Sequence, residues 1–278
     1  MARKQAESPA AGRRNLNHIL RYATTTAVML ICAVAAIAAF QKSGQFLVND
    51  ARFTLGAPSE DGETNQNIRL YGADHAPQSR VLAIFDRDFG RSIYLLPLAE
   101  RRRQLLAVEW VKDASVRRVW PNRLEIQLSE RQPVAFVQVP SRHSGALRLA
   151  LIDEDGVILE PPERAQYRLP VLTGVRRDQS LASRRDGVRR MLRLTGEAGS
   201  LAESISEIDV SDPDNLKVTE QVDGRVLTLL VGTRSFRQRL EKFHAYYPEI
   251  RSQLGDAATL DLRIENRIVS VKGAGDAH

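Results

Sequence analysis

The sequence predicts an α+β fold that is attached to a single N-terminal membrane-spanning helix. One uncharged apolar run of 19 residues lies near the N-terminus, at residues 22–40. After it, apolar patterns typical of strands and of helices alternate along a chain of 278 residues that is 43% hydrophobic, enough for a proper core. The one cysteine, Cys32, lies inside the apolar run, which excludes a disulfide or a cysteine-based metal site in the rest of the chain.

Residues 22–40 match a membrane-spanning helix in length and charge. At 1.5 Å per residue they span about 28 Å, close to the thickness of the hydrocarbon layer of a bilayer. Two alternatives stay open: a buried helix of a soluble domain, and a cleaved signal peptide with an A-x-A site near Ala36 and Ala38. The apolar region of a signal peptide is normally shorter, which favours an uncleaved anchor.

The charges that flank this run predict its orientation. Residues 1–21 form a basic tail with five basic and one acidic side chain, whereas only two basic residues occur in the dozen after the span. The positive-inside rule therefore places the tail in the cytoplasm and the bulk of the chain on the far side of the membrane. Without the tail the net charge falls from +6 to +2, so nucleic-acid binding loses its main support.

A linker is expected at residues 41–66, which are rich in Gly, Ser, Asn and acids. The unit after it, residues 67–133, has the order strand, helix, helix, strand, strand, which predicts two helices on one face of a sheet. The expected strands are at residues 68–71, 111–120 and 124–128, and the expected helices at residues 79–89 and 98–108.

Several side chains of this unit have a predicted environment. Phe85 is expected to be buried, because it belongs to an apolar stripe at helical spacing. The three arginines at residues 101–103 are expected on a solvated helix face rather than in a lipid or partner patch. Trp110 and Trp120 are expected to fill the core.

The remainder, residues 134–272, predicts a β-rich domain with two helices, followed by a disordered tail at residues 273–278. Asp223-Gly224 between two apolar runs predicts a hairpin. The acids at residues 153–155 are expected in a solvated turn, because the twelve-residue spacing of a calcium loop is absent. The expected strands are at residues 134–139, 147–152, 157–159, 205–210, 216–222, 226–231, 259–264 and 268–271, and the helices at residues 184–196 and 234–250.

The sequence lacks the common motifs of catalysis and cofactor binding. G-x-S-x-G, H-E-x-x-H, the P-loop and G-x-G-x-x-G are all absent. The five histidines show no partner spacing, and each is expected to be an ordinary surface residue. We therefore expect a binding function, with no enzymatic activity, no cofactor, no metal and no small-molecule substrate.

Five short motifs beyond the membrane follow one known pattern. They are EWV at residues 109–111, VRR at residues 116–118, ERQPVA at residues 130–135, LPVLTG at residues 169–174 and LDLR at residues 260–263. In residue type and spacing they resemble the FtsQ/DivIB family of bacterial cell-division proteins, over roughly residues 67–272.

The resemblance implies a POTRA domain at residues 67–133 followed by the family's β domain. It also implies a single-pass type II protein of the inner membrane at the division septum, acting as a non-enzymatic divisome scaffold that binds FtsB- and FtsL-like partners. By match to the D-L-R motif, the expected contact residues are Arg263, Ile264 and, less directly, Val269. Strand addition at the C-terminal edge would supply backbone hydrogen bonds. Ordinary strand stabilisation is the alternative role of these residues.

Two other classes of protein were considered. A different membrane-anchored POTRA protein, acting as a secretion or assembly chaperone, is the main alternative, although such proteins usually repeat the domain or precede a barrel. An anchored hydrolase needs a catalytic constellation that this sequence does not contain.

The flanking charges lead to a prediction of topology. A reporter enzyme that works only outside the cytoplasm, fused after Gly273, is expected to be active in cells, because the basic tail retains the N-terminus inside. The control is a reporter that works only in the cytoplasm, fused at the same position and expected to be inactive. Activity of this second reporter would reverse the orientation.

Overall fold

The computed structural model describes residues 10–56, 67–140, 146–162, 166–254, 258–264 and 267–271. The chain divides into two compact units, which are described separately. Unit 1 comprises Met1–Tyr71, Leu82–Arg102 and Ser115–Gln127, and unit 2 comprises Gly72–Val81, Arg103–Ala114 and Leu128–His278. The expected tail at residues 273–278, the turn at residues 265–266 and His143 lie outside the described residues.

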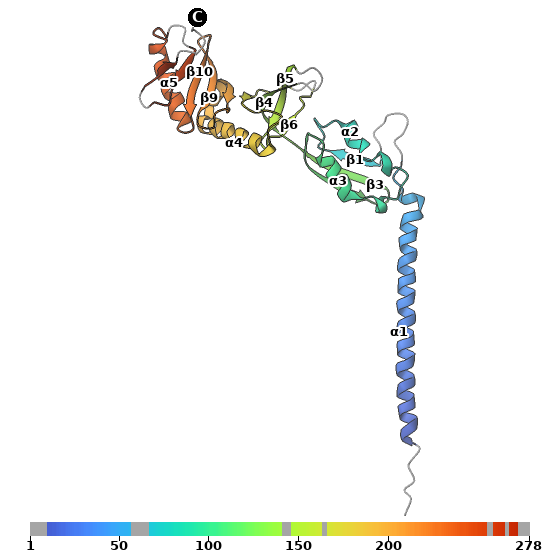
Figure 1. The fold of residues 1–278 in the computed structure, drawn as a ribbon. Coiled ribbons are helices and arrows are strands. Elements are labelled where there is room, and N and C mark those ends of the chain that lie inside the picture. Colours follow the sequence, from blue (N-terminus) through green and yellow to red (C-terminus); the bar gives the residue numbers. More distant parts are fainter. Residues whose placement is uncertain are drawn as a thin grey trace, which may run out of the picture. The chain divides into compact units, whose positions relative to one another are not determined.

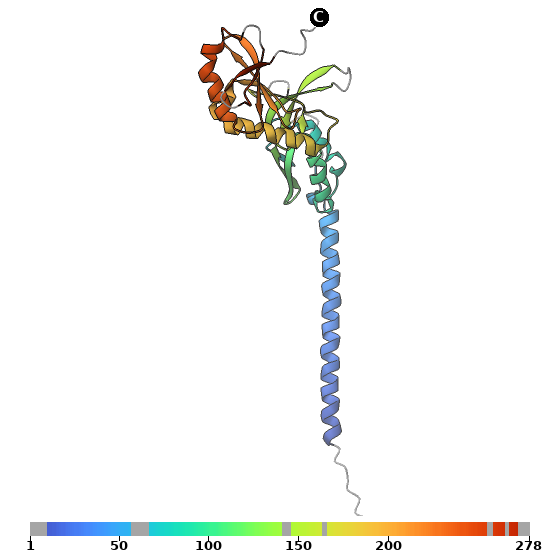
Figure 2. The same ribbon diagram turned by 60° about the vertical axis from the view of Figure 1, so that its left-hand side comes forward.

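The expected membrane-spanning segment lies in one continuous helix, α1 (Ala10–Asn49) (Figures 1 and 2). Among the described residues, α1 is the one helix that is long and apolar enough to cross a membrane, over Tyr22–Lys42. None of that window is buried, which distinguishes α1 from the core helix of a soluble domain. The hydroxyls of Thr25 and Thr26 donate to the carbonyl oxygen of Tyr22 at 2.9 and 2.8 Å, so the helix itself satisfies these polar groups.

The chain that leaves α1 is ordered over part of the expected linker. α1 extends to Asn49, and the carboxylate of Asp50 caps the short 3₁₀ helix η1 (Ala51–Phe53) by accepting from the backbone N–H of Arg52 at 2.9 Å. Phe53 and Leu55 are buried. These two apolar side chains attach the segment to unit 1, a packing that the polar composition of residues 41–66 conceals.

The first sheet has three strands in the order β1-β3-β2, and β1 runs parallel to β3. With two short α-helices between the first and second strands, it has the expected order of strand, helix, helix, strand, strand. The elements are β1 (Ile68–Tyr71), α2 (Gln78–Ala83), η2 (Asp86–Asp88), η3 (Ile93–Leu95), α3 (Leu98–Leu106), β2 (Val111–Val119) and β3 (Arg123–Glu130).

The expected environments of three side chains have different outcomes. Phe85 is fully buried, as predicted, although α2 ends at Ala83 and Phe85 lies in the turn that follows. Trp110 is buried as expected, and its indole Nε1 donates to the carbonyl oxygen of Glu160 at 3.0 Å. The prediction for Trp120 is wrong, since this side chain is 71% exposed. Trp120 follows the last residue of β2, so the inward alternation of the strand does not extend to it.

The prediction of a solvated arginine face on α3 is wrong for Arg101. This residue is buried, and its guanidinium donates from Nε to Asp88 Oδ2 at 2.6 Å and from Nη2 to Asp88 Oδ1 at 2.9 Å. The bidentate pair satisfies the fully buried Asp88 carboxylate. Sequence spacing alone did not reveal it, because the two residues come from different elements.

The second sheet has nine strands in the order β12-β11-β10-β9-β8-β7-β4-β5-β6. It contains every expected strand and one more, β7, formed by the LPVLTG motif. Asp223 and Gly224 have φ values of 49° and 78°, as the predicted hairpin requires. The strands are β4 (Pro133–Pro140), β5 (Leu147–Asp153), β6 (Ile158–Leu159), β7 (Val171–Thr173), β8 (Ile205–Asp209), β9 (Leu216–Val222), β10 (Arg225–Gly232), β11 (Thr259–Asp261) and β12 (Val269–Val271).

Two helices, α4 (Leu181–Ala198) and α5 (Phe236–Ile250), pack on the second sheet (Figure 1). Their buried faces join the strands in one hydrophobic core. The inward residues of α5 are Phe236, Leu240, Phe243 and Tyr247. Tyr246, also on α5, is exposed.

Polar side chains of unit 2 are more buried than the sequence suggested. Asp153 was expected to be solvated, but it is buried and accepts from Arg131 Nη1 at 2.6 Å and from the backbone N–H of Val157 at 2.7 Å. His75 lies at the surface, as expected, and its ring stacks on Trp110 with centroids 5.0 Å apart. Its Nδ1 also lies 2.8 Å from Glu130 Oε2. The first two residues of the ERQPVA motif, Glu130 and Arg131, are thus half-buried and hydrogen-bonded.

Glu220 on β9 is a fully buried acid whose side chain faces the core between the sheet and α5. The nearest cationic partner is His244 of α5, whose Nε2 is 3.2 Å from Glu220 Oε2 without hydrogen-bond geometry. Burial raises the pKa of Glu220 to about 7 and lowers the pKa of His244. Burial therefore favours the neutral form of both groups.

Phe85 tests the core of the first sheet. Replacing Phe85 with Ala in the ectodomain is expected to lower the free energy of unfolding by about 3–5 kcal/mol, because a fully buried aromatic ring is removed. The control is Tyr71→Ala at an exposed position, which should change stability by less than about 0.5 kcal/mol. Equal unfolding midpoints for both variants would contradict the packing.

Glu220 leads to a prediction about pH. The Glu220 carboxyl binds its proton more tightly in the folded state than in the unfolded chain. The stabilisation that this proton gives is complete below pH 4.5 and is lost as pH rises through about 7. Glu220→Gln lacks this loss. The free energy of unfolding of the variant, relative to that of the wild type, should therefore increase by about 3 kcal/mol from about pH 4.5 to pH 8. His244 acts in the opposite direction but is common to both proteins. Parallel curves of urea-unfolding stability against pH would contradict the prediction.

Candidate functional site

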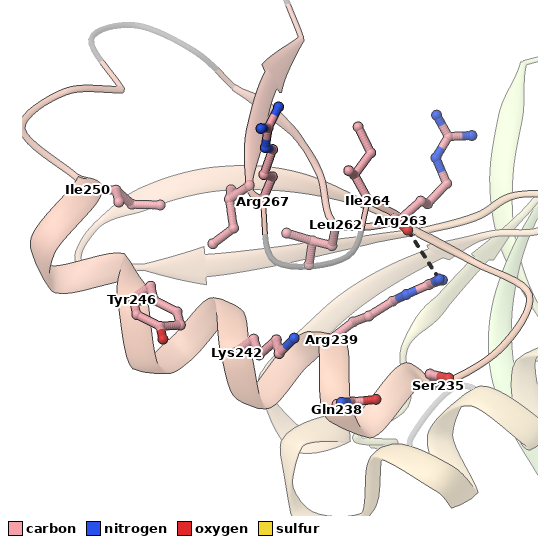
Figure 3. Close-up of a pocket in the computed structure, with 11 residues that line it drawn as sticks. Ser235, Gln238, Arg239, Lys242, Tyr246, Ile250, Leu262, Arg263, Ile264 and Arg267 are labelled. Carbon is pink, nitrogen blue, oxygen red and sulfur yellow. Dashed lines mark hydrogen bonds between the residues drawn. The ribbon is translucent and has the colours of Figure 1, made fainter.

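A groove of about 540 Å³ opens at the C-terminal end of the second sheet. α5 and Ser235 before it form one wall, and residues 262–264 and 267–268, which lie between β11 and β12, form the other (Figure 3). Both walls belong to unit 2. The lining residues are Ser235, Gln238, Arg239, Lys242, Tyr246, Ile250, Leu262, Arg263, Ile264, Arg267 and Ile268.

The α5 wall follows from the helical repeat. Residues 239, 242, 246 and 250 are spaced by three or four positions and therefore share one side of the helix. The core-facing stripe of Phe236, Leu240, Phe243 and Tyr247 lies beside them on the same helix. Burial of that stripe fixes the rotation of α5, so the second stripe must face the groove.

Arg239 connects the two walls. Its Nη1 donates to the carbonyl oxygen of Val231 at 2.5 Å, and its Nη2 donates to the carbonyl oxygen of Arg263 at 3.4 Å, which is the dashed line in Figure 3. Gly232 makes this possible, because a Cβ atom there would lie 2.7 Å from Arg239 Nη1. The guanidinium thus holds the segment after β11 close to α5.

Arg263 has a structural partner of its own. Its guanidinium donates to Asp261 from Nε to Oδ1 at 2.9 Å and from Nη2 to Oδ2 at 2.6 Å. The bonded guanidinium lowers the pKa of the Asp261 carboxyl. This pair fixes the turn out of β11, which is in accordance with the alternative role of Arg263, stabilisation of the strand end, and the expected partner contact stays a prediction.

β12 is the last strand in the order of the second sheet. It pairs antiparallel with β11, with Asp261 opposite Val269, and among the described residues no strand pairs with its other side. All of its residues are exposed. Such an edge presents unpaired backbone groups that a strand of another chain can complete.

The groove combines positive charge with apolar surface. Its lining contains four cationic residues, and none of the lining residues is acidic. On the wall after β11, apolar side chains alternate with these charges, including Ile264, which is 49% exposed. On α5, Tyr246 and Ile250 follow the charged residues toward the end of the helix. The surface is therefore complementary to a segment that carries both carboxylates and apolar side chains.

The three contact residues expected from the sequence lie in this region. Arg263 and Ile264 line the groove, whereas Val269 lies on the adjacent edge strand and is not part of the lining. The contribution of α5 was missed. The spacing of Arg239, Lys242 and Tyr246 was a usable signal, but it overlaps the stronger apolar stripe of the same helix.

No group of three or more His, Cys, Asp or Glu side chains arranged to hold a metal ion occurs in the part of the chain that the structure describes.

Comparison with protein families identifies both extramembrane regions. Residues 65–131 match the POTRA domain, FtsQ-type. Residues 142–263 match the family described as cell division protein FtsQ/DivIB, C-terminal. The second match ends at Arg263, so Ile264 and β12 lie beyond it.

Several curated proteins are similar to this chain in sequence. Cell division protein FtsQ of Koribacter versatilis is 35% identical over 214 residues, which cover 74% of this chain and 60% of the relative. Cell division protein FtsQ of Syntrophotalea carbinolica is 23% identical over 260 residues, covering 91% of this chain and 85% of the relative. The match thus spans less than two thirds of the length of the Koribacter protein.

Proposed function

Because the chain belongs to the FtsQ/DivIB family of cell division proteins, we propose that it is a non-enzymatic scaffold of the divisome. In this proposal residues 67–133 are the POTRA domain and residues 134–272 the β domain. The scaffold links cytoplasmic and periplasmic division proteins during septum formation. Its partners are FtsB- and FtsL-like single-pass proteins.

The proposed topology is type II in the inner membrane. The basic tail at residues 1–21 lies in the cytoplasm, and the two extramembrane regions lie in the periplasm, in accordance with the positive-inside rule. The division septum is the proposed location within that membrane.

The observation that carries the proposal is the edge of β12, which no strand of the described residues pairs, beside the cationic groove. A partner strand added to β12 would bond to its exposed backbone. A neighbouring stretch of the same partner would place apolar side chains against Ile264 and Ile268 and carboxylates near Arg267. Edge and groove together favour one partner chain that has a strand and an acidic, apolar segment.

A POTRA-bearing secretion or assembly chaperone is the alternative function. The two functions predict different distributions in the cell, since a divisome scaffold gathers where the septum forms. A fluorescent fusion of the full chain that forms a mid-cell ring supports the scaffold. An even signal around the membrane supports the chaperone.

Ile264 tests the groove. Ile264→Glu is expected to weaken capture of the FtsB-like partner by at least about tenfold, because a carboxylate without a partner would be buried in the contact, and tenfold corresponds to about 1.4 kcal/mol. The ectodomain should stay folded, since Ile264 is half exposed in the free protein. Affinity is measured by titration with the partner, and folding by circular dichroism.

The matched control is Val226→Glu. Val226 is an exposed apolar strand residue of β10 that does not line the groove, so its replacement adds the same charge elsewhere. The control should bind at wild-type affinity. Folded Ile264→Glu protein with wild-type affinity would refute the groove, as would an equal loss in both variants.

A further inference from the structure

Unit 1 exposes a group of large apolar side chains that the fold does not cover. Trp120 is 71% exposed, Leu95 is 50% exposed and Tyr94 is 38% exposed. Together with Phe53 beneath them, we call these residues the aromatic cluster. Single exposed apolar residues are common on protein surfaces, but a contiguous set that includes Trp and Tyr indicates a contact surface.

The aromatic cluster is built around Phe53. The buried ring of Phe53 lies edge-on to Tyr94, with centroids 5.6 Å apart, and is tilted against Trp120 at 6.2 Å. The three rings come from η1, from η3 and from the turn after β2, three segments that are distant in sequence. Their proximity is therefore a product of tertiary packing.

The exposed side chains are held in place by hydrogen bonds. Arg118 on β2 donates from Nε to the carbonyl oxygen of Ile93 at 2.6 Å and from Nη2 to that of Leu96 at 2.8 Å. These bonds fix η3, which carries Tyr94 and Leu95. The apolar residues thus face outward from an ordered segment that is bonded at both ends.

The cluster lies next to the end of the candidate membrane span. Phe53 follows the last residue of α1 by four positions, and the residues of the cluster belong to the same compact unit as α1. In both ribbon views the turn between β2 and β3 lies beside the C-terminal end of α1 (Figures 1 and 2). A bilayer that contains α1 is therefore close to these side chains.

The length of α1 beyond the candidate span determines the depth of the aromatic cluster relative to the bilayer. From Lys42, where the span ends, to Asn49, α1 rises by about 10 Å. The headgroup layer on each side of the hydrocarbon is about 5–8 Å thick. With Lys42 at the hydrocarbon boundary, the end of α1 is thus about 2–5 Å beyond the headgroup layer. The apolar sequence at residues 46–48 favours a span that lies deeper in the bilayer by that amount. Trp and Tyr prefer this layer, because their rings are apolar and their N–H and O–H groups are polar.

We propose that the aromatic cluster is a membrane contact. Its exposed residues Tyr94, Leu95 and Trp120 lie in the headgroup layer of the bilayer that contains α1. Only residues 50–52 separate Phe53 from the end of α1. This short connection holds the first sheet at the membrane surface. This role is independent of the partner groove and of the direction in which the chain crosses the membrane.

The test uses the fluorescence of Trp120 in the full chain. The protein is reconstituted in vesicles of phosphatidylethanolamine and phosphatidylglycerol that carry a spin-label quencher at the headgroup or at the end of the acyl chain. The headgroup label is expected to quench the tryptophan emission more than the chain-end label. Trp120→Phe should lose this quenching, because the remaining Trp110 is buried within unit 2.

A matched control moves the indole to the other end of the same sheet. Tyr71 is exposed at the end of β1 opposite Gln127, whereas Trp120 precedes the start of β3. Trp120→Phe/Tyr71→Trp should therefore show no headgroup quenching. Absence of headgroup quenching in the wild type would refute the membrane contact. Quenching that persists in Trp120→Phe, or that is equally strong in Trp120→Phe/Tyr71→Trp and the wild type, would also refute it. Circular dichroism checks that each variant is folded, as expected for substitutions at exposed positions.

Discussion

The packing of α4 and α5 on the second sheet is the constraint on which the candidate site depends. An amphipathic helix has one apolar stripe, and burial of that stripe decides where every other side chain of the helix points. In α5 the buried residues Phe236, Leu240, Phe243 and Tyr247 leave Arg239, Lys242 and Tyr246 to face the segment after β11. The groove is therefore a consequence of core packing.

Buried carboxylates show how the fold balances charge. Asp88 and Asp153 each accept a hydrogen bond of 2.6 Å from an arginine, Arg101 and Arg131 respectively. Glu220 has no such cation and stands at 3.2 Å from a histidine without a hydrogen bond. The arginine guanidinium compensates the desolvation of each paired aspartate, whereas burial raises the pKa of Glu220 to about 7. The polar interior thus contains acids that are bonded to an arginine and one acid, Glu220, that has no arginine partner among the described residues and whose pKa is raised by burial.

The two proposed surfaces differ in the kind of counterpart that they would contact. In the proposal of a membrane contact, the aromatic cluster of unit 1 contacts lipid and needs no specific protein partner. The groove and the edge of β12 in unit 2 offer hydrogen bonds, charge and apolar contact, which together can select a partner chain. The aromatic cluster thus offers amphipathic rings to lipid headgroups, and the groove offers charge and hydrogen bonds to a protein chain.

The sequence by itself determined the apolar span, the order of the strands and helices, and the family motifs, because each depends on residues that are close together along the chain. It also predicted Arg263 and Ile264 as contact residues, through a local motif, and their role stays a prediction. Only the tertiary structure decided the exposure of Trp120, the burial of Arg101 and Asp153, and the role of α5 in the groove. Each of these depends on which distant segment lies opposite a side chain. Periodicity shows which face of an element is apolar, but the pairing of a buried charge or the wall of a groove is fixed only when separate elements pack together.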